Sequence, residues 1–276
     1  MLIISAWQDA KYGTIANIIL LLGVIAGFGQ WQFEKKFFSD VAAALEQNNI
    51  SEDNLLTETD LQHLPVCVQR YLRYVGVVNK PKVKNMRLVF EGRMRDKGKD
   101  WFPLKSLQYN FYDLPARLFF MNGRMFGIDV PGYHNYTRGV ATMEIKLFGL
   151  YPLISNKGKN LNKAETVTLF NDMCFLAPAT LIGNHTQWYP IDDVSAKAQF
   201  TCNGITISAI LLFNQQGQLV NFISEDRYAI GDNQQYKFST PVKDYKNIGG
   251  YNLPTFGQTI WHYPDGPFTY GEFHLK

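Results

Sequence analysis

Two carboxylates in the second half of the chain have settings in which acid–base chemistry is feasible. Asp172 lies inside the apolar run FNDMCFL, and Asp192 follows the segment QWYPI. Burial raises the pKa of a carboxyl group and a basic neighbour lowers it, so two carboxylates in different environments can divide the roles of general acid and general base. His185 or His262 would then assist the proton transfer. The alternative is that Asp172 is a solvated residue on the outer face of a helix.

Arg227, in the segment EDRY, is the residue best suited to hold an anion. Its planar guanidinium group can bind a carboxylate or a phosphate through two parallel hydrogen bonds. Aromatic residues near the expected strand ends would supply the apolar part of a binding site. We therefore expect one cavity mouth to gather a set of aromatic and charged residues: Trp101, Asp172, Trp188, Asp192, Arg227, Tyr228 and Trp261. The alternative is that the rings pack between sheet and helix while Arg227 pairs with a carboxylate.

Motifs of common enzyme chemistries are missing from the sequence. It has no GxSxG elbow, no GxxxxGK[ST] phosphate loop, no GxGxxG and no HExxH. The five histidines are scattered, and the three cysteines, Cys67, Cys174 and Cys202, form no CxxC pair. We therefore expect no metal, no cofactor and buried free thiols. A net charge of +3, from 27 basic and 24 acidic residues without a long run of one sign, gives no footprint for nucleic acid.

The N-terminal segment, residues 1–36, carries an apolar stretch without Asp, Glu, Lys or Arg from Tyr12 to Phe33. At about 1.5 Å per residue, a helix of this length spans a hydrocarbon core of roughly 30 Å. We expect a retained single-pass membrane anchor. A cleaved signal peptide and a buried soluble helix are the alternatives. Lys11 on one side balances Lys35 and Lys36 on the other, so the side of the membrane on which the chain folds stays open.

A helical neck, residues 37–82, and a β domain, residues 83–276, follow the anchor. The spacing of apolar residues predicts helices over Phe37–Gln47 and Leu64–Gly76, and the latter has Pro in its first turn and Gly beyond its end. From Val83 onward the apolar period changes to two, which predicts about ten short antiparallel strands. Asn203-Gly204 is typical of a hairpin turn in which both residues have positive φ.

One helix, residues 163–177, interrupts the strands. The segment NKAE, from Asn162 to Glu165, has the form of a capping box, and Pro178 ends the helix. Apolar residues three and four apart along it predict a face that covers the sheet. The fold class is therefore mainly β, or α+β: an N-terminal transmembrane helix, a short helical neck, and a large curved antiparallel sheet or half-barrel with one covering helix.

The order of several motifs resembles a bacterial family of unknown function, domain-of-unknown-function family 6544. The motifs are FNDMCFLAPATLI, the hairpin FTCNGITISAILLFN, the segment GQLVNFISEDRY and the late GGYNLPTFGQTIWHY. The helix LPVCVQRYL and the segment EGRMRDKGKDWFPLKSLQY fit the same family. The resemblance covers roughly Leu61 to the C-terminus. It implies a membrane-tethered, β-rich domain in a bacterium, and it brings no reaction and no catalytic residues.

Three functional hypotheses follow. The favoured one is a membrane-tethered module whose concave sheet binds a lipid or another apolar small molecule near the bilayer. The second is an enzyme that uses Asp172 and Asp192 on an unknown substrate, which requires both carboxylates to face one cavity. The third is a structural or partner-binding domain whose interior is filled by its own side chains. The sequence pattern predicts no particular protein partner.

Overall fold

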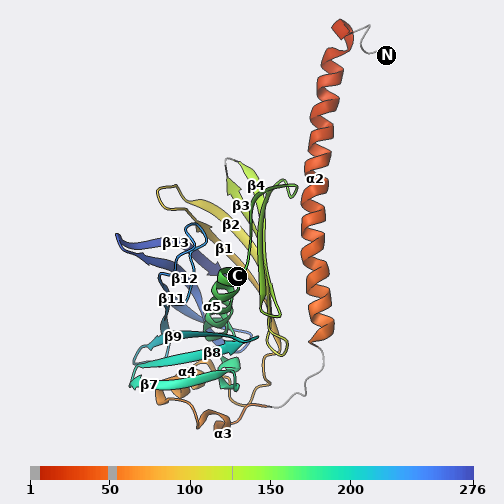
Figure 1. Ribbon diagram of the computed structural model, residues 1–276. Coiled ribbons are helices and arrows are strands. Elements are labelled where there is room, and N and C mark those ends of the chain that lie inside the picture. The colour runs from red at the N-terminus through yellow and green to blue at the C-terminus, as the bar shows by residue number, and fades with distance from the viewer. Residues whose placement is uncertain (1–6, 49–54, 126) are drawn as a thin grey trace.

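The computed structural model describes residues 7–48, 55–125 and 127–276. A single helix, α2 (Trp7–Gln47), contains both the apolar N-terminal stretch and the helix expected at Phe37–Gln47. Its N-terminal part extends beyond the rest of the molecule, whereas its C-terminal part lies along the β domain (Figure 1). Over Lys11–Gln47 it is long and apolar enough to cross a membrane.

Two short helices precede the sheet. The first is α3 (Glu58–Leu61) and the second is α4 (Val66–Val75), which begins directly after Pro65. Gly76 ends α4 in the left-handed conformation with φ of 82°, a conformation in which glycine is favoured because it has no Cβ. The face of α4 that carries Tyr71 and Leu72 is buried against the β domain, in accordance with the predicted apolar face.

In the described part of the chain, thirteen strands form one antiparallel sheet. The strands are β1 (Asn85–Met94), β2 (Phe102–Phe111), β3 (Ala116–Met125), β4 (Ile128–Thr137), β5 (Val140–Leu147), β6 (Tyr151–Lys157), β7 (Thr186–Asp192), β8 (Ser195–Cys202), β9 (Ile205–Phe213), β10 (Leu219–Ser224), β11 (Lys237–Ile248), β12 (Tyr251–Tyr263) and β13 (Gly266–Leu275). Their order is β6-β5-β4-β3-β2-β1-β13-β12-β11-β10-β9-β8-β7. The first and last strands therefore pair in the middle of the sheet, and β6 and β7 are its edges.

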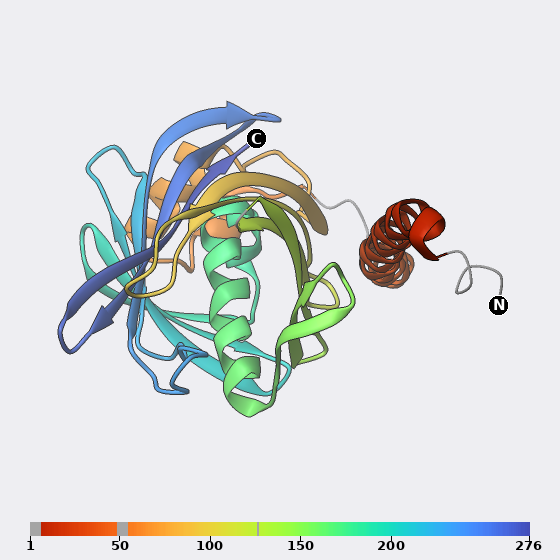
Figure 2. The same cartoon turned by 90° about the horizontal axis from the view of Figure 1, so that it is seen from above.

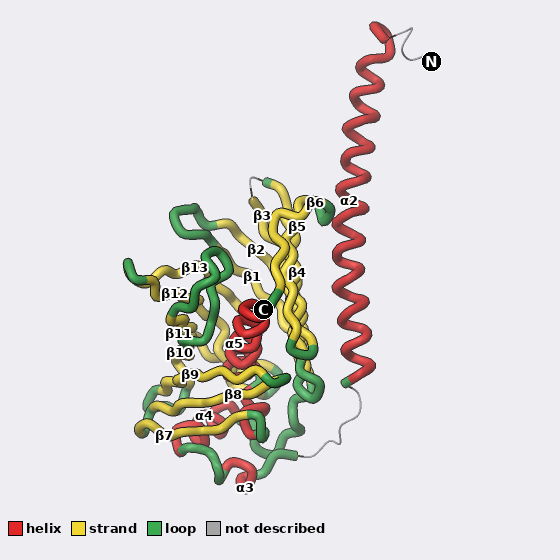
Figure 3. The backbone as a smooth tube through the Cα atoms, in the orientation of Figure 1, coloured by secondary structure: helices red, strands yellow, loops and turns green. Residues whose placement is uncertain are grey.

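Helix α5 (Lys159–Leu176) connects the two edge strands and, with the short 3-10 helix η1 (Pro178–Ile182), leads from β6 to β7. The sheet curls around α5, which lies inside the curve (Figure 2). Helices α3 and α4 lie at the end of the curve opposite to the direction in which α2 projects (Figure 3). The predicted curved antiparallel sheet with one covering helix is thus confirmed.

Two strands, β6 and β7, are absent from the sequence-based expectation. Both contain a proline, Pro152 in β6 and Pro190 in β7, and neither shows a clear alternation of apolar and polar residues. Proline cannot donate a ladder hydrogen bond, so it weakens the strand signal of a short segment. Both strands lie at the edges of the sheet.

The start of α5 also differs from the prediction. The helix begins at Lys159 after Gly158, so Asn162 is inside the helix and is not its cap. The Asn162 side-chain oxygen accepts a hydrogen bond of 2.8 Å from the backbone N–H of Ala141, and Glu165 turns to the concave side of the sheet. The capping-box interpretation is wrong because tertiary partners use both side chains.

Strand β3 is buried on both faces, because the sheet is covered on its convex as well as its concave side. On the convex side Phe37 of α2 contacts Phe120 and Tyr133, with ring centroids 5.4 Å apart in each case. Arg117, Phe119 and Met121 lie on the other face, toward α5. The run of consecutive apolar residues in β3 is explained by these two contacts.

Candidate ligand cavity

A cavity of about 690 Å³ lies between the concave face of the sheet and α5. We call it the inner cavity. Its wall is mainly apolar, and typical wall residues are Phe90, Phe119, Met121, Met143, Phe175 and Phe273. Small-molecule sites commonly have volumes of roughly 300–1,000 Å³ and walls of this kind. The interior of the domain is therefore not filled by its own side chains.

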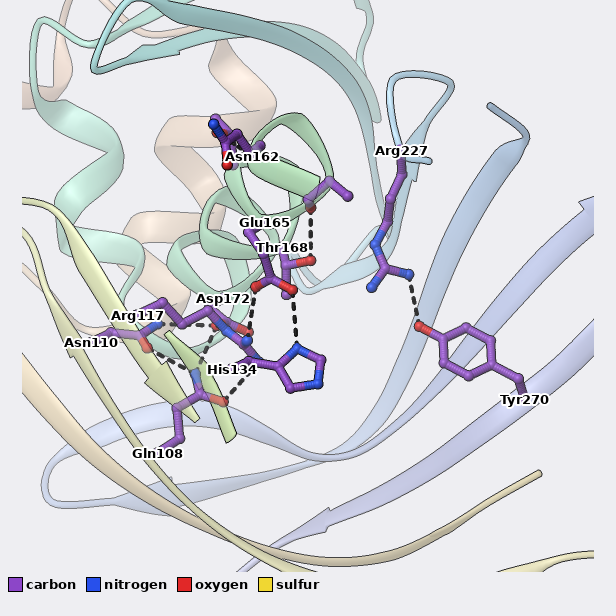
Figure 4. A network of polar contacts seen from close by, with 12 residues as sticks. Gln108, Asn110, Arg117, His134, Asn162, Glu165, Thr168, Asp172, Arg227 and Tyr270 are labelled. Carbon is purple, nitrogen blue, oxygen red and sulfur yellow. Dashed lines mark hydrogen bonds and ion pairs between the residues drawn. The ribbon is translucent and has the colours of Figure 1, made fainter. Parts of the chain in front are cut away.

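A network of buried polar side chains forms one wall of the inner cavity (Figure 4). Two of its members come from α5, where Glu165 and Asp172 are seven residues apart and hence lie two turns apart on one face. Arg117 reaches them from β3, and it pairs in register with Asn110 of β2. Gln108 points to the same side as Asn110, because residues two apart in a strand share a face.

Arg117 is the centre of this network. Its Nε donates to Asp172 Oδ2 at 2.8 Å, and its Nη1 donates to Glu165 Oε2 at 3.1 Å. Its Nη2 donates to the side-chain oxygen of Gln108 at 3.1 Å. Every nitrogen of the guanidinium group thus has an acceptor, as a buried charge requires.

Asp172 has two further donors besides Arg117. Gln108 Nε2 lies 2.7 Å and Asn110 Nδ2 lies 3.0 Å from the same Oδ2 atom. Gln108 Nε2 also donates to Asn110 Oδ1 at 2.9 Å, so the two amides are held to each other as well. Asp172 is therefore neither on the solvated face of the helix nor without a basic partner.

Glu165 is held in its ionised form. Burial would raise its pKa, but the hydrogen bond with His134 and the positive charges of Arg117, His134 and Arg227 outweigh burial and lower the pKa to about 2. His134 Nδ1 lies 3.2 Å from Glu165 Oε1. The pKa of Arg117 is correspondingly raised, because Asp172 and Glu165 overcome the effect of burial. The centre of the network is thus a triad of the Arg117 guanidinium and the carboxyl groups of Glu165 and Asp172, in which Arg117 and Glu165 are ionised at neutral pH.

Arg227 reaches the inner cavity from the segment after β10, and its surroundings differ from those of Arg117. Its guanidinium carbon lies 4.2 Å from the ring centroid of Phe238, 5.0 Å from that of Trp261 and 5.9 Å from that of Tyr270. Its Nη1 donates to Tyr270 Oη at 2.7 Å. Rings within about 6 Å attract a cation through their π faces, so this aromatic group fixes the side chain.

The guanidinium group of Arg227 retains hydrogen-bonding capacity. Its Nε is buried and has no hydrogen-bond partner in the described part of the chain. No carboxylate of the described residues is within ion-pair distance of it either. A buried donor without an acceptor is costly, and an anionic group of a ligand would supply that acceptor.

Four of the seven residues expected at the site line the inner cavity: Asp172, Arg227, Tyr228 and Trp261. They come from α5, from the segment after β10 and from β12, so the fold brings together residues that are far apart in the sequence. Of the four, only Asp172 takes part in the polar network described above. Trp261 instead contributes to the aromatic group around Arg227.

The other three residues, Trp101, Trp188 and Asp192, are not among those that line the cavity. The guanidinium groups of Arg93 and Arg95 lie over the ring of Trp101, with their central carbons 4.6 and 4.4 Å from its centroid. Trp188 Nε1 donates to the carbonyl of Leu181 at 3.4 Å. Asp192 is exposed at the end of β7 and accepts a hydrogen bond of 2.9 Å from the Val194 N–H.

The acid–base hypothesis required Asp172 and Asp192 to face one cavity, and the fold does not bring them together. Hydrogen bonds from the backbone of Val194 and from the side chain of Ser195 lower the pKa of Asp192. This is the behaviour expected of a carboxylate that caps a turn. No group of three or more His, Cys, Asp or Glu residues suited to hold a metal ion occurs among the described residues. The three cysteines are free and buried.

Sequence reasoning missed Gln108, Asn110, Arg117, His134 and Glu165. A signal for Arg117 was present, because it stands next to the apolar run LFFM in the first half of β3, which is buried. A charged residue in such a strand needs a buried partner of opposite charge. The identity of the partner could not be predicted, because Glu165 and Asp172 meet Arg117 only when α5 folds into the sheet.

Comparisons with known proteins give a family and distant likenesses to solved structures, two of which are described here. The model of a family of unknown function (DUF6544) matches residues 54–273. No curated protein matches the chain. The crystal structure of a LolA superfamily protein from Nitrosomonas europaea is similar at 10% sequence identity and a TM-score of 0.33, over 76% of this chain and 90% of that chain.

The second solved structure is a β-barrel-like protein of the domain of unknown function DUF1849 from Brucella abortus. It has 8% sequence identity and a TM-score of 0.21, and the similarity covers 71% of this chain and 97% of that chain. At these scores neither likeness bears on what the chain binds.

Proposed function

The chain belongs to the family of unknown function DUF6544, and because that membership brings no activity, we propose a function from the inner cavity. The protein is a membrane-tethered β domain that binds a lipid or another apolar molecule with an anionic group. The observation that carries this proposal is an apolar cavity of about 690 Å³ with Arg227 at its wall.

The wall of the inner cavity supports an apolar ligand. Phenylalanine and methionine side chains from both halves of the sheet face it, and they would gain free energy by contact with acyl chains instead of water. Methionine adapts to ligands of varied shape because its side chain is unbranched and flexible. Met121 and Met143 occupy such positions.

Arg227 supports an anionic group on that ligand. Arg117 is also in the wall, but Glu165, Asp172 and Gln108 already occupy its nitrogens. Arg227 donates to Tyr270 and has a buried Nε without an acceptor in the described part of the chain. A carboxylate or phosphate would therefore bind at Arg227, with its tail along the apolar wall.

Helix α2 supports the membrane tether. Its apolar residues from Ile15 to Phe28 are exposed to a degree that is unusual for a soluble protein. A helix with such a surface is stable in a bilayer, where its side chains contact acyl chains. The tether would hold the inner cavity close to its source of ligand.

The test is photolabelling of the full-length chain, purified in detergent, with a fatty acid that carries a diazirine in its acyl chain. Mass spectrometry then maps the labelled residues. We expect labels on the cavity side of β3–β5, at residues such as Phe119, Met121 and Met143. Labels confined to the exposed part of α2 would contradict the proposal, because they would report only the detergent–lipid layer around the anchor.

Two variants and one control make this experiment specific. Thr168→Trp fills the cavity from α5 and should abolish labelling of its wall. Arg227→Met removes the charge and keeps an unbranched side chain, so it should weaken labelling by the fatty acid. Arg87→Met is the control, because Arg87 is exposed on β1. Equal labelling of the cavity in all three variants would refute the proposed site.

A further inference from the structure

Contacts between α2 and the sheet define the level at which the helix leaves the β domain. The turn between β5 and β6 lies against Gly29, and a Cβ atom on Gly29 would approach the carbonyl oxygen of Phe148 to 2.6 Å. A Cβ on Gly149, which has φ of 68°, would come within 2.5 Å of the carbonyl oxygen of Gly29. Two glycines thus permit helix and hairpin to meet backbone to backbone.

The start of β4 reaches the same level, because the Gln30 side chain donates to the carbonyl of Asp129 at 3.5 Å. The turns at the other end of these strands lie beside the last residues of α2. There the Leu114 N–H donates to the Asn48 side chain at 2.9 Å, and Arg138 donates to Gln47 at 3.3 Å. Figure 3 shows the same arrangement, with α2 projecting past the upper ends of strands β3 to β6.

The length of the projecting helix matches a bilayer. From Tyr12 to Trp31 the helix rises about 30 Å at 1.5 Å per residue, which is the thickness of a hydrocarbon core. Trp31 is exposed, and the Lys35 ammonium nitrogen lies over its ring, 5.0 Å from the ring centroid. This arrangement is suited to the membrane–water interface. If this stretch spans the bilayer, one interface lies at Gly29–Trp31.

At that level the β domain exposes apolar side chains on the two hairpins. On the β5–β6 hairpin, Tyr151 is 68% exposed and Leu153 is 51% exposed. The other exposed apolar residues at this end of the two hairpins are Met125, Ile128, Phe148, Leu150 and Ile154. We call this set of seven residues the hairpin surface. Water is a poor solvent for such a surface, and headgroups and upper acyl chains are a better one.

The β5–β6 hairpin also forms part of the wall of the inner cavity. Ile145 and Ile154, which pair with each other across β5 and β6, both line it. Because β6 is an edge strand, no further strand of the sheet stands between this wall and the surroundings. Ile154 thus belongs both to the hairpin surface and to the wall of the inner cavity.

We propose that the hairpin surface enters the same membrane interface that α2 crosses, so that β6 forms the entrance through which a ligand passes from the bilayer into the inner cavity. This inference rests on the proposed function, since it assumes the tether and the cavity ligand. The occupant is the lipid layer and not a second copy of the chain, because Gly29 fixes the hairpin surface beside a helix that is itself in the bilayer.

The position of the hairpin surface can be measured with a fluorescent label on the full-length chain in lipid nanodiscs. Leu153→Cys carries the label on the surface, and Val140→Cys carries it on an exposed apolar position at the β4–β5 turn, the opposite end of the same sheet region. The native cysteines are buried, so a thiol reagent selects the introduced residue. One quencher is attached to the lipid acyl chain and the other is aqueous iodide.

We expect the label at position 153 to be quenched by the acyl-chain quencher and to be protected from quenching by iodide. The label at position 140 should show the reverse. Quenching by iodide at both positions would overturn the inference. So would protection of the label at position 153 from both quenchers together with disulfide-linked dimers of the unlabelled Leu153→Cys chain, since a second copy would then cover the surface.

A loading assay separates this inference from the proposed function. The doubly substituted Leu150→Ser, Leu153→Ser chain should lose labelling of the cavity when the photoreactive fatty acid is supplied in the bilayer. It should keep that labelling when the fatty acid is supplied in detergent micelles. Loss of labelling by both routes would overturn the entrance and point to a damaged cavity. A bilayer-buried label at position 153 with a cavity that is never labelled would instead refute the proposed function and its entrance, and would leave only the membrane contact of the hairpin surface.

Discussion

Arg117 Nε and Asp172 Oδ2 lie 2.8 Å apart and join β3 to α5 across the interior of the curved sheet. Their side chains are only 8% and 11% exposed. Removing two charges from water is costly, and the mutual attraction compensates for this cost only when hydrogen bonds satisfy the remaining polar atoms. Gln108, Asn110 and Glu165 meet that condition here. The pair therefore fixes how α5 sits in the curve, and with it the shape of the inner cavity.

Replacement of Arg117 by methionine is expected to destabilise the fold strongly. It leaves Glu165 and Asp172 buried without their main cation, and such uncompensated charges cost about 3–5 kcal/mol of unfolding free energy. Denaturant unfolding of the full-length chain in detergent measures this loss. Arg124→Met is the control, because Arg124 is exposed on the same strand, and surface changes alter stability by about 0.5 kcal/mol or less. Equal stability of the two variants would mean that the triad does not hold the fold.

The stability of the chain should fall in acid partly because of Glu165. Its pKa is lowered from 4.5 to about 2 in the folded state, so between these values the unfolded state binds a proton that the folded state does not. Stability is therefore lost as pH falls through this window, by roughly 3 kcal/mol for this group. Glu165→Gln lacks this titration and leaves Arg117 with one carboxylate. We expect it to be less stable than the wild type at pH 6 and to show a smaller loss between pH 5 and pH 3 in urea unfolding. Parallel curves for both proteins would contradict the lowered pKa.

The parts of the fold that repeat a local pattern were predictable from the sequence. A period of two in β1, β8 and β9 predicted half-buried strands, and Asn203-Gly204 predicted their turn, which the positive φ values of 49° and 76° confirm. The edge strands β6 and β7 were missed because neither shows an alternation of apolar and polar residues. Each is recognised as a strand only by its pairing, β6 with β5 and β7 with β8.

The candidate site was less predictable, because its chemistry arises from contacts that are distant in sequence. Asp172 was recognised as unusual inside its apolar helix, and Arg227 as a candidate anion site. Whether an arginine at the site can still bind an anion, however, depends on its partners in the fold. Arg117 meets Asp172 from 55 positions away, whereas Arg227 meets aromatic rings and no carboxylate among the described residues. No local pattern could say which of the two arginines is saturated and which can still bind a ligand.

The docking of α2 on the convex face should depend on Phe37. Its side chain is fully buried and contacts Phe120 and Tyr133. Truncating a buried phenylalanine to alanine costs about 3–5 kcal/mol, through lost transfer free energy and the cavity that remains. Phe38→Ala is the matched control, because Phe38 is the adjacent residue of the same helix and is 45% exposed. We expect thermal unfolding in detergent to show a large loss for Phe37→Ala and a small one for Phe38→Ala. Similar losses would mean that the helix does not dock through this face.

The contact between α2 and the β5–β6 turn should depend on the absence of a single methyl group. Alanine is favoured over glycine inside a helix by about 1 kcal/mol, so Gly→Ala ought to stabilise α2 wherever space permits. At Gly27 a Cβ atom would meet nothing within 4 Å, whereas at Gly29 it would clash with the Leu150 side chain and with the backbone of Phe148. We therefore expect Gly27→Ala to be neutral or stabilising and Gly29→Ala to weaken the contact despite its better helix propensity. Hydrogen exchange of the amides of Gly149 and Leu150, read by mass spectrometry on the chain in nanodiscs, measures the contact directly. Because the two substitutions are chemically identical and two residues apart, faster exchange in Gly29→Ala alone would assign the effect to the backbone approach, and equal exchange in both would refute it.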